Sequence, residues 1–389
     1  MIAAVIAAAV QLPVAATAGL SNAFKDPRFV HLGLAPLAPA LADTVASTYP
    51  FASASASIEF VYDPALDVVE RRPGPLGPIF GERAETIGPG RFDLDVSYSY
   101  VDLATINGRP LDHLVSLAGV KGRFLFFRVP DGILLQDGRL SSILPVRVAL
   151  DLGVTAHIAT PSLTYGVTRD LDVNVSLPIV GTALDVRTRT RVPDPRQPQF
   201  ALPPGDPAAR TVVQEASDTS EGVGDLLLRA KYVLHRGGPL DLAAGLGISL
   251  PTGRTEDFQG TGTTRVQPAL IASRRLWRLE LLANAGPDLV ADDVDRSILR
   301  WAVGGTASIV ECLTLAVVFL GRHELARQTD PIDVPFFFQI ERNDIYDASV
   351  GVRWRFAEAG VVSANAIVPL NRDGLRADAI PTVRLEYTF

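Results

Sequence analysis

Apolar and polar residues alternate strictly along the final stretch of the chain, residues 380–389. A period of two places the two sets of side chains on opposite faces of a β-strand. One face therefore meets an apolar environment, and the other meets a polar one. The apolar set is Val383, Leu385, Tyr387 and Phe389, and the polar set is Thr382, Arg384, Glu386 and Thr388.

Alternation of the same kind recurs from Arg91 onward and predicts about 12 strands, a number that membrane barrels use. At Pro161 the parity of the apolar residues changes, and we expect a β-bulge there. The predicted strands cover residues 92–100, 148–167, 171–179, 226–234, 240–250, 265–275, 278–289, 299–309, 313–322, 346–356, 361–369 and 380–389.

The connections between these strands alternate between long and short, which is the arrangement of outer-membrane barrels with short periplasmic turns. Short turns lie near residues 169, 236, 277, 312 and 358, and the last strand then ends on their side. We predict an all-β fold, a closed antiparallel up-and-down transmembrane β-barrel with both termini periplasmic. A secreted β-sandwich also has alternating strands, but the regular loop alternation favours the barrel. The long connections lie near residues 105–145, 191–222, 252–263, 290–298, 326–343 and 371–379.

The polar faces of these strands carry charges of both signs, which a water-filled lumen tolerates. The strand at 240–250 adds glycines on that face, which would leave room inside the barrel. The residues predicted to line the lumen are Asp225, Arg229, Lys231, Arg265, Arg275, Arg278, Glu280, Arg353, Arg355, Arg384 and Glu386.

The amino-terminal part of the chain follows another pattern. Residues 1–18 are apolar and end in an Ala-x-Ala sequence, which predicts a secretory signal peptide cleaved after Ala18. Residues 19–90 are irregular and rich in Pro, Gly, Ala and Ser, and we expect a periplasmic or lumen-filling segment there. The barrel itself would then occupy residues 91–389.

Composition narrows the alternatives. The formal net charge of −7 argues against nucleic acid as a partner. Beyond the amino terminus no apolar run reaches the ~18 residues of a membrane-spanning helix. The one cysteine, Cys312, makes neither an internal disulfide nor a cysteine-based zinc site.

Catalytic and metal-binding motifs are lacking in the sequence. His323 and Glu324 begin a zinc motif, but Arg327 occupies the position of its second histidine. An acidic cluster in a predicted outer loop consists of Asp292, Asp293 and Asp295. We interpret it as a solvated turn in preference to a divalent-cation site. We therefore predict no catalytic residues, no metal and no cofactor. An outer-membrane lipase or acyltransferase remains an alternative, and it requires a Ser–His pair at the barrel rim.

Several short stretches resemble the outer-membrane barrels grouped as "MetA-pathway of phenol degradation" transporter-like proteins. The resemblance implies a channel that admits small compounds, aromatic or apolar ones among them, and it brings no catalytic residues. The stretches are Gly81–Gly88 with Arg91–Tyr98, Thr164–Asp172, Glu221–Leu226 with Ala230–Tyr232, and Leu250–Gly253.

Together these observations predict a passive channel of the bacterial outer membrane and not an enzyme. A structural barrel with a blocked lumen is a further alternative. The expected partners are a small-molecule solute, outer-membrane lipid and lipopolysaccharide. The barrel-assembly machinery would bind the insertion signal predicted at Val383, Leu385, Tyr387 and Phe389, because a C-terminal aromatic strand is typical of its substrates.

Overall fold

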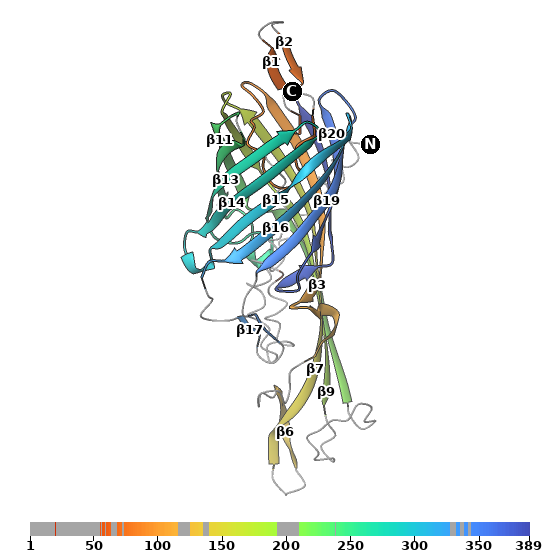
Figure 1. Cartoon of the computed structure of the whole chain (residues 1–389). Helices are drawn as coiled ribbons and strands as arrows, with labels where there is room; N and C mark the ends of the chain where they lie inside the picture. The colour runs from red at the N-terminus through yellow and green to blue at the C-terminus, as the bar shows by residue number, and fades with distance from the viewer. Residues whose placement is uncertain are drawn as a thin grey trace.

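The computed structural model describes a protein built of antiparallel β-strands (Figure 1). The described residues are Leu20, Ser55, 57–58, 60–63, 68–71, 74–115, 125–134, 140–192, 210–237, 239–326, 332–334, 338–340 and 344–389. Residues 1–18, the predicted signal peptide, lie outside them. Among the described residues no helix is both long enough and apolar enough to span a membrane.

Three one-turn 3-10 helices, η3 (Leu111–His113), η5 (Thr255–Asp257) and η6 (Val294–Arg296), lie in connections between strands. The strands are β1 (Phe60–Asp63), β2 (Val68–Arg71), β3 (Phe92–Ile106), β4 (Arg109–Pro110), β5 (Leu114–Val115), β6 (Leu125–Leu134), β7 (Leu140–Gly166), β8 (Leu171–Ser176), β9 (Ile179–Val192), β10 (Arg210–Val223), β11 (Leu226–His235), β12 (Asp241–Leu250), β13 (Arg265–Leu276), β14 (Leu279–Val290), β15 (Ile298–Val310), β16 (Leu313–Glu324), β17 (Ile332–Val334), β18 (Phe338–Ile340), β19 (Ile345–Arg355), β20 (Gly360–Pro369), β21 (Leu375–Ala377) and β22 (Ile380–Thr388).

The described residues form a closed antiparallel barrel of 12 strands, which confirms the predicted fold class. β8 and β9 together make one span, and so do β10 and β11. The first of these spans is interrupted at Pro178 and the second at Gly224. The two interruptions lie side by side, and the Gly224 amide donates to the Pro178 carbonyl at 2.7 Å. The last span, β22, pairs with the first span, β3, through seven residue pairs, and this pairing closes the cylinder. Closure leaves no unpaired sheet edge in lipid.

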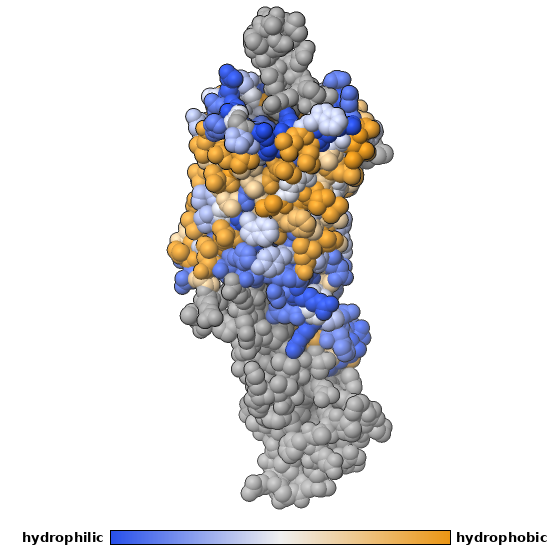
Figure 2. Space-filling view, in the orientation of Figure 1, coloured by the Kyte–Doolittle hydropathy of each residue, from blue (hydrophilic) through white to orange (hydrophobic). Residues whose placement is uncertain are grey.

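Alternation along the strands separates two surfaces as predicted. In β3 the side chains of Phe92, Leu94, Val96 and Tyr98 are exposed, and the aspartates and serines between them are buried. Figure 2 shows that apolar residues form a band around the barrel, between hydrophilic residues at its two ends. Apolar residues on the outside with polar residues inside are the signature of a barrel that spans a membrane.

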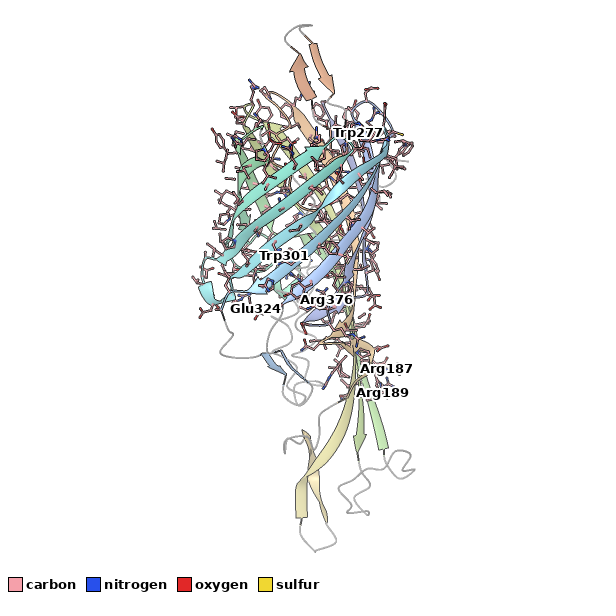
Figure 3. All side chains as sticks on the ribbon, viewed as in Figure 1. Arg187, Arg189, Trp277, Trp301, Glu324 and Arg376 are labelled. Carbon is pink, nitrogen blue, oxygen red and sulfur yellow. The ribbon has the colours of Figure 1, made fainter. Side chains whose placement is uncertain are left out.

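The short turns gather at one end of the barrel, which we call the turn end, and the long connections at the other, the loop end (Figure 1). The carboxy terminus lies at the turn end. Trp277 projects from a short turn there, whereas Trp301, Glu324 and Arg376 lie toward the loop end (Figure 3). Which end faces the periplasm stays a prediction.

The prediction of a β-bulge at Pro161 is wrong. β7 pairs with β3 and β9 in unbroken register, and its even-numbered residues from 150 to 166 are buried on the inner face. The chemistry of the inner face changes instead: Leu152, Val154 and Ile158 are buried toward the loop end, and Ser162 and Thr164 toward the turn end. Parity analysis assumes that apolar side chains share one face, and the inner face of β7, which is apolar in its loop-end half, breaks that assumption.

The prediction of a long loop over residues 191–222 is wrong for the second half of that range. Residues 210–223 form β10, which pairs with β9 along 14 residue pairs. Together with β7, the two strands extend beyond the barrel at its loop end, where Arg187 and Arg189 are labelled in Figure 3. Charges on both strands, such as Arg187 and Glu215 at 3.0 Å, hid this segment from an analysis based on apolar alternation. The intervening residues 193–209 lie outside the described residues.

Candidate functional site

Residues 74–90, which we call the lumen segment, lie inside the turn-end half of the barrel. Leu76, Ile79, Phe80, Ala84 and Ile87 are all buried, although the segment has no regular secondary structure. Its backbone groups instead pair with inward side chains of the wall. The amides of Leu76, Glu82, Ala84 and Ile87 donate to Thr314, Asn284, Ser273 and Asp172, respectively, at 2.6–3.1 Å.

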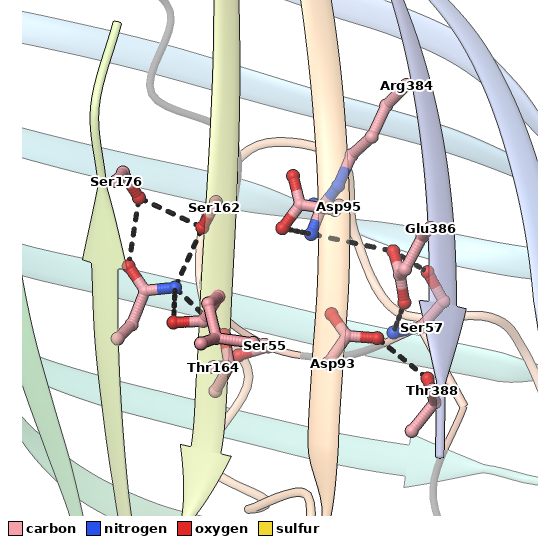
Figure 4. Close-up of polar contacts among 12 residues, drawn as sticks. Ser55, Ser57, Asp93, Asp95, Ser162, Thr164, Ser176, Arg384, Glu386 and Thr388 are labelled. Atoms are coloured by element: carbon pink, nitrogen blue, oxygen red, sulfur yellow. Dashed lines mark hydrogen bonds and ion pairs between the residues drawn. The ribbon is translucent and has the colours of Figure 1, made fainter. Parts of the chain in front are cut away.

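A buried ion network joins the terminal strand, β22, to its neighbour β3 and to β19, which lies beyond β20 (Figure 4). Arg384 lies 3.0 Å from Asp95 on β3 and 3.5 Å from Glu386. Arg353 on β19 donates to Glu386 at 2.8 Å. Ser57 donates to the Glu386 carboxylate through both its amide and its hydroxyl, so the network also holds the chain that precedes the lumen segment.

A second network surrounds Lys231 on β11. The ammonium donates to Ser55 Oγ at 2.7 Å and to the Arg83 carbonyl at 3.2 Å, and it lies 3.9 Å from Asp172. On β13, two strands further along the wall, the guanidinium of Arg275 lies 3.8 Å from Glu85 and 3.7 Å from Glu280. Glu85 belongs to the lumen segment, and its pKa lies below its usual value. Burial alone would raise this pKa, but the positive charges of Arg83 and Arg275 outweigh burial and lower it.

The structure brings ten of the eleven predicted lumen residues to the inner side of the wall. Most contact other protein groups: Arg229 bonds Asn174 and Ser176, Arg265 pairs with Asp288, and Asp225 binds a loop described below. Arg355 lies near the turn end, 3.9 Å from Glu358. Whether any of them lines a conducting path stays a prediction.

Arg278 is not a lumen residue. β13 ends at Leu276 and β14 begins at Leu279, so the turn consists of Trp277 and Arg278 and lies one residue later than expected. The exposed guanidinium donates to the Ile309 carbonyl at 2.9 Å and lies 5.4 Å from the Trp277 ring centre. Trp277 adopts a φ of 53°, which alternation cannot reveal.

A cavity of about 320 Å³ remains inside the barrel. Its wall includes Phe80 of the lumen segment, and small residues of β12 that the sequence analysis expected to leave space. The polar groups around it are largely paired with each other, as Arg229 is with Asn174 at 3.0 Å. Lining residues include Asn174, Arg229, Gly245, Gly247, Ile271, Asn284, Ala302, Leu320, Ile367 and Ile380.

The connection between β12 and β13, residues 251–264, also bonds to the inner wall. Thr182 on β9 donates to the Asp257 carbonyl at 2.8 Å, and Gln259 donates to Ser220 on β10 at 3.2 Å. Asp257 is fully buried, and its carboxylate accepts the Leu20 amide at 3.0 Å. Sequence analysis identified residues 252–263 only as one of the long connections and did not predict their position.

The four stretches that carry the family resemblance meet in two pairs. In the first, Thr86 donates to the Arg169 carbonyl at 2.6 Å. Gly166 packs so closely that a Cβ there would lie 1.8 Å from the Gly88 carbonyl oxygen. In the second pair, Asp225 accepts the Gly253 amide at 3.0 Å. The stretches therefore fix the lumen segment and the β12–β13 connection to the wall.

In the outward set on the terminal strand, three residues are exposed and Leu385 is half-buried. Val383, Tyr387 and Phe389 are 50–58% exposed. Phe389 and Phe92 exchange backbone hydrogen bonds of 2.8 Å, and their ring centres lie 5.7 Å apart. The role of this strand as a signal stays a prediction.

Metal chemistry finds no support among the described residues, where no three His, Cys, Asp or Glu side chains gather to hold an ion. Asp293 instead accepts the Asp295 amide at 3.2 Å within its turn. His157 bonds Tyr98 at 2.7 Å. His323 lies 3.4 Å from the Tyr346 hydroxyl and 3.5 Å from the Asp344 carboxylate.

The closed barrel, its apolar outer band and its polar interior define a transmembrane β-barrel of the bacterial outer-membrane type. The family model described as "Putative MetA-pathway of phenol degradation" matches residues 136–304. The match confirms the resemblance for the stretches at 164–172, 221–232 and 250–253, whereas residues 81–98 lie outside it. No curated protein sequence matches the chain significantly.

Several solved outer-membrane proteins are similar in structure. The COG4313 outer membrane channel from Pseudomonas putida F1 is 14% identical with a TM-score of 0.46, over 79% of this chain and 98% of that one. The Ralstonia pickettii toluene transporter TbuX is 11% identical with a TM-score of 0.37, over 82% and 96%. A Pseudomonas aeruginosa FadL homologue is 13% identical with a TM-score of 0.33, over 77% and 90%.

Proposed function

We propose that this protein is a channel for passive uptake of small compounds, aromatic or apolar ones among them. The observation that carries the proposal is the cavity of about 320 Å³ inside a closed membrane barrel. Passive transport requires only a pore whose shape and lining suit the solute. The cavity combines apolar side chains such as Ile271 and Leu320 with charges already neutralised by neighbours, which favours uncharged solutes over ions.

The family match supports the same solute class, since its description refers to phenol degradation. The enzyme alternative needs a Ser–His pair, whereas His157 contacts Tyr98, and His323 contacts Tyr346 and the Asp344 carboxylate. The blocked-barrel alternative is favoured by the lumen segment, but the cavity beside Phe80 argues for a constricted path over a sealed one.

Purified protein in liposomes tests the proposal. Folding is verified first by heat-modifiable migration on a gel, and then the entry of phenol is compared with that of a sugar of similar mass. We expect faster phenol entry than in protein-free liposomes and little sugar entry. Folded protein that adds neither solute flux nor conductance would rule out a channel.

We also infer the biogenesis of the chain. Cleavage after Ala18 would deliver it to the periplasm, and the assembly machinery would read the strand ending at Phe389. The turn end would then face the periplasm and the loop end the lipopolysaccharide. Amino-terminal sequencing of protein from outer membranes should begin at Gly19, and a different first residue would contradict this order of events.

A further inference from the structure

Asp257, in the connection between β12 and β13, has a fully buried carboxylate. Its backbone carbonyl accepts the hydroxyl of Thr182 at 2.8 Å, and Thr182 is buried on the inner face of β9. The residue is therefore fixed against the inner wall of the barrel. Burying a carboxylate is costly unless hydrogen-bond donors and positive charge surround it. Both oxygens of Asp257 thus need partners within the protein.

The two oxygens of this carboxylate differ in their partners. Oδ1 accepts the backbone amide of Leu20 at 3.0 Å. Oδ2 is buried, lies 3.1 Å from Arg254 Nη1 and accepts no hydrogen bond from the described residues. The Arg254 side chain is 52% exposed, so solvent screens its charge and it offsets little of the cost of burial. The carboxylate therefore has room for a further cationic donor.

The donor to Oδ1 belongs to the predicted start of the exported chain. Cleavage after Ala18 makes Gly19 the first residue and Leu20 the second. The first residues of a chain are usually poorly ordered unless they are tied down. Leu20 is only 1% exposed, and its amide is bonded to Asp257. This part of the chain is therefore held inside the protein.

Cleavage changes the chemistry of the nitrogen next to Leu20. Hydrolysis of the peptide bond between Ala18 and Gly19 consumes one water and leaves a carboxylate on Ala18 and an amine on Gly19. Near neutral pH this amine is mostly an ammonium, because an α-amino group has a pKa of about 7.7–8.0. Three covalent bonds, about 4.3 Å of chain, join it to the Leu20 nitrogen. That nitrogen lies 3.0 Å from Asp257, so the ammonium can reach the carboxylate.

We propose that Asp257 is the binding site for the α-ammonium that cleavage after Ala18 creates on Gly19. The ammonium supplies Oδ2 with charge-assisted hydrogen bonds, and Oδ1 keeps the Leu20 amide. The mature amino terminus is then fixed inside the barrel and is not free in the periplasm, where the sequence analysis expected it. The precursor cannot form this pair, because its Gly19 nitrogen is an uncharged amide. The inference rests on the cleavage site given under the proposed function.

Labelling of the exported protein with an N-hydroxysuccinimide ester tests the proposal, with mass spectrometry of the amino-terminal peptide as the readout. The reagent attacks a neutral amine, whereas a neighbouring carboxylate favours the charged form. We expect the α-amine of the folded protein to react about tenfold or more slowly than that of protein unfolded in urea, because ion pairing and burial both protect it. Equal rates in the two states overturn the proposal without any variant.

Asp257→Asn separates the ion pair from burial. The new side chain keeps the shape and can still accept the Leu20 amide, but it carries no charge, so labelling of the α-amine should become about tenfold faster. Glu256→Gln is the matched control, because the Glu256 side chain is 57% exposed and its loss should leave the labelling rate unchanged. Folding of each variant is verified by heat-modifiable migration. A folded Asp257→Asn variant whose α-amine stays as protected as before overturns the ion pair.

Amino-terminal sequencing of the same sample separates this inference from the proposed function. A first residue other than Gly19 overturns the cleavage site and the ion pair together. Gly19 as the first residue, with an α-amine that is not protected, overturns the ion pair alone. The channel function is judged separately by solute entry into liposomes.

Discussion

Arg353 donates a 2.8 Å hydrogen bond to Glu386 inside the barrel, and neither side chain is more than 1% exposed. The two residues lie on β19 and β22, the strands on either side of β20. Arg353 also donates to the Gly77 and Pro78 carbonyls, and Glu386 accepts from Ser57. One ion pair thus links the terminal strand of the wall to the chain inside the lumen.

Replacing one partner of this pair should destabilise the barrel strongly. Glu386→Gln preserves shape but leaves two buried guanidinium groups, Arg353 and Arg384, short of negative charge. Loss of one partner from a buried ion pair costs about 3–5 kcal/mol, and urea unfolding in lipid vesicles measures the change.

Glu358→Gln is the matched control for that experiment. Glu358 lies 3.9 Å from Arg355, but its side chain is 94% exposed, and exposed pairs contribute little. We expect its unfolding curve to match that of the unchanged protein. Equal stability of the Glu386→Gln variant would show that the buried pair does not hold the wall together.

Acid should loosen the lumen segment through Glu85. The pKa of Glu85 is lower in the folded protein than in the unfolded chain, where it is about 4.3. Its ionised carboxylate therefore stabilises the fold fully at pH values above the unfolded-state pKa. That stabilisation is lost as the pH falls through the lower folded-state pKa. We expect pepsin to cleave within residues 74–90 faster as pH falls below about 4. Glu85→Gln should remove part of this pH dependence, and an identical pH profile would contradict the assignment.

Filling the cavity should slow solute entry. A Cβ on Gly245 would lie 3.3 Å from the Ile271 side chain, so Gly245→Leu is accommodated by a small shift and occupies cavity space. We expect phenol entry into liposomes to fall several-fold. Ala244→Leu adds the same bulk on the lipid-facing side and should have no effect; a similar loss in both variants would mean that folding, and not the cavity, was impaired.

Removing the terminal aromatic ring should impair assembly in cells more than stability in vitro. Phe389→Ala keeps the backbone hydrogen bonds with Phe92 but loses the exposed ring. Most of the variant should fail to reach the outer membrane, whereas refolding into detergent should proceed nearly as before. Quantitative blotting of membrane fractions measures the first, and gel migration the second. Normal levels in the membrane would remove Phe389 from the insertion signal.

Alternation was a reliable guide where lipid lies on one side of a strand and polar groups on the other. It correctly placed Arg353, Arg384 and Glu386 on the inward-facing sides of their strands, although it did not show that they pair with each other. It failed at Arg278, where a two-residue turn shifted the strand by one position. It also missed β10, whose many polar residues pair with β9.

The sequence by itself determined that this chain closes into a lipid-facing barrel, because a period of two and alternating loop lengths are local properties of the chain. Only the tertiary structure decided what occupies the inside. The contacts of Asp225 with residues 253 and 261, and of Asp172 with residue 87, join segments far apart in the chain. No local pattern encodes such contacts, because they exist only once the wall has closed around the segments that it holds.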